Sequence, residues 1–139
     1  MADIFLSYTQ EDLSRVRPVI EALEQQGLSV WWDRKIAPGK TYTQVITEEL
    51  KTANAVVVVW SQTSVKSEWV QIEATQGKRR GILVPLMIDA IEYDIPLEFS
   101  LMEAADLTDW DGVSSHHELD ALLRSVGDIL SASQVIAPN

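Results

Sequence analysis

The segment AVVVVW, residues 55–60, decides the fold class. Its consecutive valines leave no polar side, whereas a strand with one face in water alternates apolar and polar residues. A continuous apolar run of this kind is typical of a central strand in a parallel sheet that is covered on both faces. Because parallel neighbours need long crossovers, the flanking sequence should alternate between helices and strands.

Toward the N-terminus, the sequence has that alternation. Apolar strand candidates occupy residues 3–7 and 28–32, and a helix between them ends at Gly27. Residues 33–41 contain Pro38 followed by a glycine, which indicates a loop, and a short helix is expected after it. The helical positions are Leu13, Val16, Ile20 and Leu23 in the first helix, and Val45, Ile46, Glu49 and Leu50 in the second.

Toward the C-terminus, a helix is predicted from Val65 to Gly77 and a fourth strand over residues 82–88. Pro85 indicates that this strand lies toward an edge of the sheet or contains a bulge. An acidic loop is expected over residues 89–103, followed by a short fifth strand at 105–108 and a final amphipathic helix. The apolar positions of that helix are Leu119, Leu122, Leu123, Val126 and Leu130.

Together these elements predict an α/β fold of the flavodoxin-like type. It would be a three-layer sandwich with a five-stranded parallel sheet of order 2-1-3-4-5 and helices on both faces. The length of 139 residues suits one domain. The apolar periodicity ends at Ser131, so residues 1–132 are assigned to the domain. Residues 133–139 are assigned to a C-terminal tail or the start of a linker to a further domain, such as a fused sensor.

The net charge of −10 is unevenly distributed along the chain. Residues 1–88 contain ten basic and ten acidic residues, whereas residues 89–139 contain eleven acidic residues and one basic residue, Arg124. A nucleic-acid-binding protein would be expected to have a basic face, so this class is excluded. Arg34, Lys35 and Lys40 form a local cationic segment that could receive a phosphate or an acidic partner, although a solvated surface loop explains the same pattern.

The chain has no cysteine, which excludes disulfides, thiolate metal sites and cysteine nucleophiles. This composition fits a reducing cytoplasm. No apolar run reaches the ~18 residues of a membrane span, and no signal peptide precedes the first strand. We therefore expect a cytoplasmic protein with no membrane partner.

Several families that share this fold class are excluded by their missing motifs. The turn after the first strand, residues 7–12, has no glycine, so neither a dinucleotide-binding fingerprint nor a phosphate-binding P-loop is present. A receiver domain would need an aspartate where Trp60 and Ser61 stand. The adjacent residues His116 and His117 lie in a polar stretch without other candidate metal ligands, so we predict no metal site.

Three segments, in this order, resemble the TIR (Toll/interleukin-1 receptor) domain family. Residues 5–8 with Glu11-Asp12 resemble its first box, and residues 30–33 with 36–39 resemble the end of the second strand and the BB loop. The residues Ser61, Ser67, Trp69 and Glu73 match the family segment S-x5-S-x-W-x3-E. The resemblance spans residues 3–110. The departures from the family pattern, which concern partner preference, are Val70, Ala74 and the weakly matching Asp109-Trp110.

The resemblance to bacterial-type members of this family implies an NAD-consuming enzyme with Glu73 as the catalytic residue. A fixed carboxylate can stabilise the oxocarbenium-like charge that develops when the nicotinamide–ribose bond breaks. Nicotinamide leaves as a neutral molecule, so one glutamate suffices. NAD would be the substrate, no separate cofactor is implied, and the product is ADP-ribose or a cyclic isomer. Such enzymes act in defence after self-association, which can be filamentous.

Helical spacing places Glu73 about 40° from Trp69 around the helix axis. We expect Val65, Trp69 and Ile72 to share one apolar face, with a partly desolvated Glu73 on its flank. The alternative is that Glu73 simply pairs with a nearby Lys or Arg.

The resemblance also implies that NAD lies between the exit of the first strand, the BB loop and the helix that carries Glu73. The rings of Tyr8 and Trp69 are candidates for stacking, and the basic BB-loop side chains for contacts with the pyrophosphate. Core packing is the alternative for both rings, and Asp33 could brace the loop instead of touching ligand. The full set of binding candidates is Ser7, Tyr8, Thr9, Asp33, Arg34, Lys35, Gly39, Lys40, Ser67 and Trp69.

Two other functions remain open for a chain with these motifs. A non-catalytic TIR adaptor would act only by homotypic contacts through the BB loop, residues 33–41. A nucleotide sensor would bind NAD-like ligands without turnover. The cationic BB loop and the acidic residues 89–111 carry opposite charges, which favours head-to-tail self-association.

Overall fold

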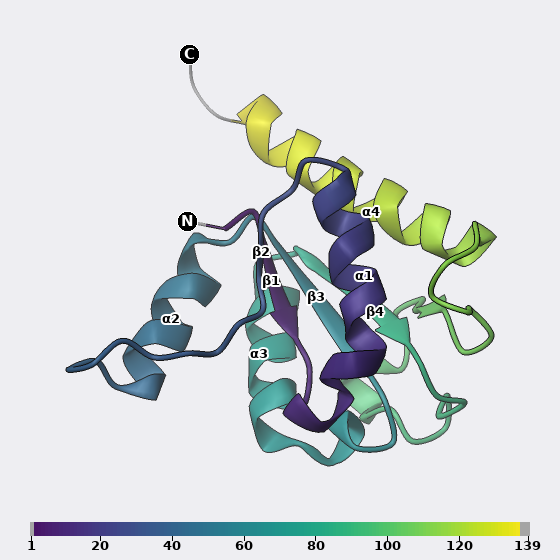
Figure 1. Ribbon diagram of the computed structural model, residues 1–139. Helices are drawn as coiled ribbons and strands as arrows, with labels where there is room; N and C mark the ends of the chain where they lie inside the picture. Colours follow the sequence, from purple (N-terminus) through teal and green to yellow (C-terminus); the bar gives the residue numbers. More distant parts are fainter. Residues whose placement is uncertain (1, 137–139) are drawn as a thin grey trace.

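The computed structural model describes residues 2–136. Five parallel strands form one sheet in the order β2-β1-β3-β4-β5 (Figure 1). This order and the all-parallel pairing confirm the predicted flavodoxin-like α/β fold. The strands are β1 (Ile4–Ser7), β2 (Val30–Trp31), β3 (Ala55–Trp60), β4 (Leu83–Met87) and β5 (Ala105–Asp106).

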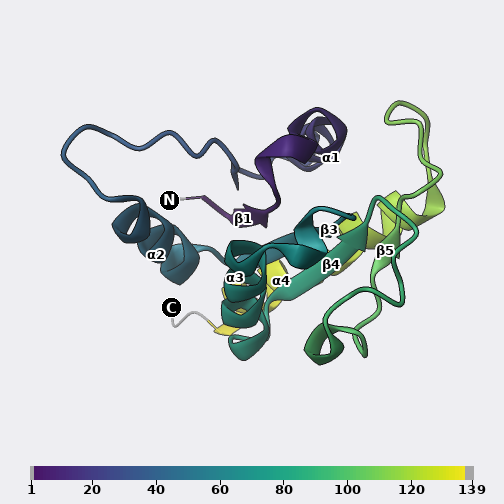
Figure 2. The same ribbon diagram turned by 90° about the horizontal axis from the view of Figure 1, so that it is seen from below.

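Helices cover both faces of this sheet, and Figure 2 shows α1 and α3 on opposite sides of β1. The α-helices are α1 (Leu13–Gln25), α2 (Tyr42–Thr52), α3 (Glu68–Arg79) and α4 (His117–Ile136). Short 3-10 helices are η1 (Gln10–Asp12), η2 (Ser64–Lys66) and η3 (Leu97–Phe99).

The valines of β3 separate the two halves of the core. Val57 and Val59 pack with α1 and α4, whereas Val56 and Val58 pack with α2 and α3. All six residues of β3 are buried, as the continuous apolar run predicted. Trp31 and Trp32 also point to opposite faces, as expected for adjacent residues of an extended segment.

Pro85 lies within β4, which is an interior strand and not an edge of the sheet. The N–H of Ile88 donates to the oxygen of Trp60 in β3 at 3.0 Å. Because N–H groups alternate along a strand, the nitrogen of Pro85 faces away from β3. On that side β5 pairs only with Leu86 and Met87, so the proline removes no ladder bond.

The helix that carries Glu73 begins later than its sequence pattern predicted. Residues 64–66 form η2, and Ser67 interrupts the helical path with extended backbone angles before α3 starts. The Ser67 hydroxyl accepts a hydrogen bond from the Val70 N–H at 3.3 Å. The prediction of one continuous helix from Val65 was therefore wrong, because Ser67 caps a new helix that begins at Glu68, three residues further on.

Helix α4 extends to Ile136, beyond the domain boundary that the loss of periodicity suggested at residue 132. Residues 137–139, the last part of the predicted tail, lie outside the described residues. Among residues 2–136, no helix has the length and apolar character needed to cross a bilayer.

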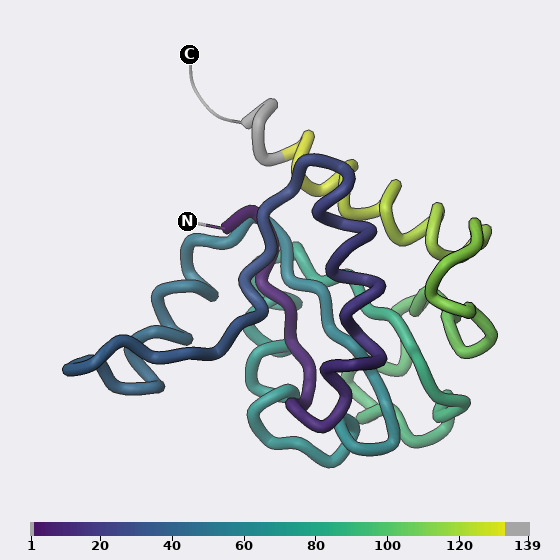
Figure 3. The backbone as a smooth tube through the Cα atoms, in the orientation of Figure 1, coloured from purple at the N-terminus to yellow at the C-terminus, as the bar shows by residue number. Residues whose placement is uncertain are grey.

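The loops that follow β1, β2 and β3 meet at the carboxyl edge of the sheet, where open α/β sheets bind ligands. One of them, residues 33–41, has no regular secondary structure and extends away from the sheet before α2 begins (Figure 3). Its Gly39 has a φ of +86°, a left-handed conformation that favours glycine.

Candidate active site

Helix α3 turns a different face toward the core from the one expected. Its buried residues are Val70, Glu73, Ala74 and Gly77, which follow one helical stripe. Trp69 and Ile72 are 44% and 52% exposed, so the prediction that they share an apolar core face with Val65 was wrong. The stripe includes a carboxylate, which a search for apolar positions leaves out.

Glu73 is 1% exposed, and both of its carboxylate oxygens are hydrogen-bonded. The Ser7 hydroxyl donates to Oε1 at 2.7 Å. Arg34 donates from Nη1 to Oε2 at 2.7 Å and from Nη2 to Oε1 at 3.1 Å, a two-pronged ion pair. The structure thus confirms the alternative that Glu73 forms an ion pair with a basic residue. Through Ser7, the pair lies at the carboxyl end of β1.

Arg34 has further contacts besides its ion pair with Glu73. Its Nη2 also donates to the oxygen of Leu6 at 2.9 Å. The guanidinium carbon lies 5.1, 5.5 and 5.0 Å from the ring centroids of Phe5, Tyr8 and Trp31. Aromatic faces attract a flat cation at such distances.

The surroundings shift the pKa of Arg34 in two opposing ways. Burial alone would lower the pKa, because it penalises the charged guanidinium. The hydrogen bonds and the charge of Glu73 outweigh burial, and the pKa of Arg34 is raised above its ordinary value. The guanidinium therefore remains a full positive charge beside the carboxylate.

Tyr8 forms one wall of the site and is 6% exposed. Its hydroxyl donates to the oxygen of Trp32 at 2.6 Å, and burial raises the pKa of that hydroxyl. The ring is therefore fixed between the core and the guanidinium. Core packing, one of the two alternatives for Tyr8, is therefore observed, and stacking of this ring on NAD stays a prediction.

A cavity of about 200 Å³ opens beside Glu73. Trp69 stands at its rim, with the ring of Tyr42 edge-on at 5.5 Å between centroids. Of the residues suggested by the sequence, the cavity brings together Tyr8, Thr9, Arg34, Ser67, Trp69 and Glu73, and Ser7 reaches it through its bond to Glu73.

Four of the suggested binding residues lie on the loop after β2 and do not line this cavity. Asp33 accepts a hydrogen bond from the Lys35 N–H at 3.2 Å, so it braces the loop as the alternative interpretation suggested. Lys35, Gly39 and Lys40 are exposed. In this conformation only Arg34 of the basic segment points into the site.

The cavity is also lined by residues that were not proposed as site residues from the sequence, namely Gln10, Glu11, Tyr42 and Val70. Tyr42 opens α2 directly after a capping box in which Thr41 and Gln44 exchange hydrogen bonds. The pattern T-x-x-Q at residues 41–44 signals that helix start and could have indicated Tyr42. The carboxylate of Asp12 accepts from Thr9 and Ser61 at 2.7 and 2.5 Å and ties the exit of β1 to that of β3.

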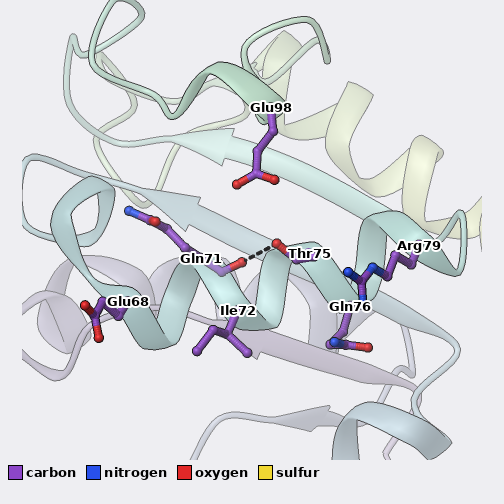
Figure 4. A pocket seen from close by; sticks show the side chains of 7 residues that line it. All are labelled: Glu68, Gln71, Ile72, Thr75, Gln76, Arg79 and Glu98. Atoms are coloured by element: carbon purple, nitrogen blue, oxygen red, sulfur yellow. Dashed lines mark hydrogen bonds between the residues drawn. The ribbon is translucent and has the colours of Figure 1, made fainter.

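A second hollow, of about 440 Å³, lies on the outward side of α3 (Figure 4). It is shallow and contains none of the motif residues. Its lining residues are Glu68, Gln71, Ile72, Thr75, Gln76, Arg79 and Glu98. None of these side chains is buried, whereas the smaller cavity contains the buried carboxylate of Glu73 and is therefore the better candidate.

The two adjacent histidines contact one carboxylate and each other. His116 contacts Asp109 at 2.8 Å and stacks on His117, with 4.9 Å between ring centroids. Among the described residues, no group of three or more His, Cys, Asp or Glu side chains could hold a metal ion.

Comparison with known proteins identifies the family. The model of the TIR domain matches residues 4–123. The chain is 37% identical over 73 residues to the probable 2' cyclic ADP-D-ribose synthase TcpO of Methanobrevibacter olleyae, covering 51% of the chain and 21% of that protein. It is 34% identical over 73 residues to the 2' cyclic ADP-D-ribose synthase AbTIR of Acinetobacter baumannii, covering 51% and 27%.

The chain thus matches about a quarter of the length of these two relatives. Among solved structures, the TIR domain of the Toll-related receptor TRR-2 from Hydra magnipapillata superimposes with a TM-score of 0.76 at 20% identity, covering 94% of this chain and 99% of that one. That likeness concerns the fold alone. On the family match over residues 4–123, the chain belongs to the TIR domain family.

Proposed function

We propose that this TIR domain cleaves the nicotinamide–ribose bond of NAD and releases nicotinamide with ADP-ribose or a cyclic isomer. One observation carries the proposal: a buried carboxylate, Glu73, lies at the base of a cavity whose rim is formed by Trp69 and Tyr42. Two relatives named as 2' cyclic ADP-D-ribose synthases support the same chemistry.

The proposed chemistry uses the charge of Glu73. As the bond to nicotinamide breaks, positive charge develops on the ribose, and a fixed carboxylate stabilises that charge. The leaving nicotinamide is neutral and needs no general acid. Ser7 donates to Oε1 and keeps the carboxylate in one orientation, which a preorganised electrostatic site requires.

The proposed substrate contacts follow from the walls of the cavity. Trp69 and Tyr42 offer exposed rings for stacking, and Thr9 and Ser67 offer hydroxyls near the carboxylate. Lys35 and Lys40 lie on the loop beside the cavity and are proposed to meet the pyrophosphate once that loop closes over the substrate.

The proposal includes self-association in bacterial immune defence. The exposed Lys35 and Lys40 lie on one loop, whereas the acidic excess of the chain falls in residues 89–139. Opposite charges on different surfaces of one chain favour head-to-tail contacts, which can extend into filaments.

A second candidate function is a non-catalytic adaptor. It is favoured by the contacts of Glu73, since Arg34 and Ser7 already donate to both carboxylate oxygens that a substrate would need. Incubation with NAD, followed by chromatography for nicotinamide and ADP-ribose products, separates the two functions. Nicotinamide release supports the enzyme; intact NAD at every protein concentration, including concentrations at which the protein assembles, supports the adaptor.

A further inference from the structure

We propose that Arg34 is an internal competitor of the substrate, a side chain that closes the site by occupying the place of the nicotinamide cation. This inference rests on the proposed function, since it assigns NAD to the cavity at Glu73. Arg34 would have to leave Glu73 before NAD binds, carried by the segment 33–41.

The first argument is the way Arg34 covers the carboxylate. Its two nitrogens lie 2.7 and 3.1 Å from the two oxygens of Glu73, and Ser7 takes a further position on Oε1. Glu73 is 1% exposed and the side chain of Arg34 is 11% exposed. A ribose hydroxyl or an oxocarbenium carbon therefore has no direct path to the carboxylate while Arg34 is in place.

The second argument is the chemical likeness between the guanidinium and the substrate. The nicotinamide ring of NAD is a flat cation before cleavage, and so is a guanidinium. The groups that hold Arg34 are the Glu73 carboxylate, the carbonyl oxygen of Leu6 and three aromatic rings, whose centroids lie 5.0 to 5.5 Å away; the rings are those of Phe5, Tyr8 and Trp31. Aromatic rings with a carboxylate form a recognition site for a flat cation.

The third argument is volume. The cavity beside Glu73 measures about 200 Å³, whereas sites for small molecules usually measure ~300–1,000 Å³. The present space admits only part of a dinucleotide. Removal of the Arg34 side chain would open the space directly in front of the carboxylate.

The fourth argument is the attachment of Arg34 to the fold. It lies three residues beyond β2, an edge strand of two residues, and α2 begins only at Tyr42. The Lys35 N–H bond to Asp33 lies within the loop and would move with it. The backbone of this loop can therefore move without breaking the sheet.

The energetic cost of releasing Arg34 makes the site selective for cationic ligands. A buried carboxylate without a partner is strongly destabilising, so the closed pair opens readily only for a ligand that restores a positive charge. NAD restores the charge through its nicotinamide ring. Neutral nicotinamide and ADP-ribose lack that cation.

The test compares the wild type with Arg34→Gln, using 1-methylnicotinamide, a flat cation that cannot be hydrolysed at a ribose bond. If about nine molecules in ten are closed by Arg34, its removal tightens apparent binding of this probe by about tenfold. KM for NAD should fall by a similar factor. Neutral nicotinamide should bind both proteins equally weakly.

The matched control is Arg17→Gln. The Arg17 guanidinium also lies on a tryptophan ring, 5.0 Å from the Trp32 centroid, but outside the cavity at Glu73. Arg34→Lys is the second variant, which keeps the positive charge if the glutamine variant does not fold. It loses the flat two-pronged contact, so probe binding should again tighten relative to the wild type.

The inference is overturned if 1-methylnicotinamide binds the folded Arg34 variants no more tightly than the wild type. A rise in KM would instead assign Arg34 to substrate binding, and a fall in kcat at constant KM would make it a positioning residue for Glu73. The proposed function fails separately, when neither protein releases nicotinamide at any concentration. The probe measurement still decides the role of Arg34 in that case.

Discussion

At the scale of single residues, the carboxylate of Glu73 determines the properties of the site. A buried charge must be paired, and Glu73 is paired with Arg34 and Ser7. The same burial that requires a partner also gives a carboxylate its catalytic strength, since few waters screen it. In the proposed mechanism, Glu73 is paired with Arg34 before the substrate binds and stabilises the developing charge on the ribose after Arg34 has left.

Trp69→Ala tests the proposed stacking role at the rim of the cavity. Because Trp69 is 44% exposed, its removal should change Tm by only a few degrees, whereas truncation of a fully buried Trp costs ~3–5 kcal/mol. We expect KM for NAD to rise about tenfold, in line with the ~1–3 kcal/mol of ring stacking on a base.

Ile72→Ala is the control for that variant, since Ile72 is 52% exposed on the same helix and lines the outward hollow. Thermal melts and NAD kinetics are measured on both. A large fall in the Tm of Trp69→Ala with unchanged KM would show that the ring supports the fold and not the substrate.

At the scale of elements, helix α3 must lie close to the sheet for Glu73 to reach Ser7. Gly77 makes this approach possible: a Cβ at that position would lie 2.8 Å from the Cβ of Val56 in β3. The distance between α3 and β3 is thus determined by Gly77, which lies one helical turn after Glu73.

Gly77→Ala should therefore destabilise the protein, by about 1–3 kcal/mol of overpacking. It should also weaken NAD turnover, because α3 shifts away from β1. Gly127→Ala in α4 is the control, since its Cβ would meet nothing within 4 Å, and it should stabilise by about 0.4–1 kcal/mol. The free energy of unfolding of both variants is measured by denaturant titration. Equal values for the two would contradict this account of the α3–β3 contact.

The elements also show how far the sequence leads. The bounds of β3 could be predicted because a run of valines is typical of a central parallel strand, and the strand order followed from the alternation of strands and helices along the chain. The start of α3 could not be predicted, because the apolar pattern begins at Val65 whereas the helix begins only after the cap at Ser67. The contact between Arg34 and Glu73 joins residues 39 positions apart, and neither spacing nor periodicity encodes such a contact.

At the scale of the whole molecule, the charge is distributed over two separate regions. The exposed loop 33–41 carries Lys35 and Lys40, while residues 89–139 hold eleven acidic residues and one basic residue. Attraction between these regions of neighbouring molecules is screened by salt, because the Debye length falls to ~3 Å at 1 M.

We expect specific activity to rise with protein concentration at low salt and to fall when salt is added. Lys35→Glu reverses one charge of the loop and should weaken both the rise and any assembly seen by light scattering. Lys51→Glu, an exposed lysine at the end of α2, is the control with the same charge change. Activity per molecule that is independent of concentration, salt and Lys35 would exclude assembly through this loop.

The most direct measurement is nicotinamide release from NAD by the wild type, Glu73→Gln and Glu68→Gln. Glutamine keeps the shape of residue 73 but removes the charge that would stabilise the oxocarbenium, so turnover should fall at least ~100-fold. Glu68 is an exposed glutamate in the first turn of the same helix, outside the cavity at Glu73, and its variant should retain wild-type turnover. Turnover by folded Glu73→Gln that stays close to the wild-type value would contradict the central claim.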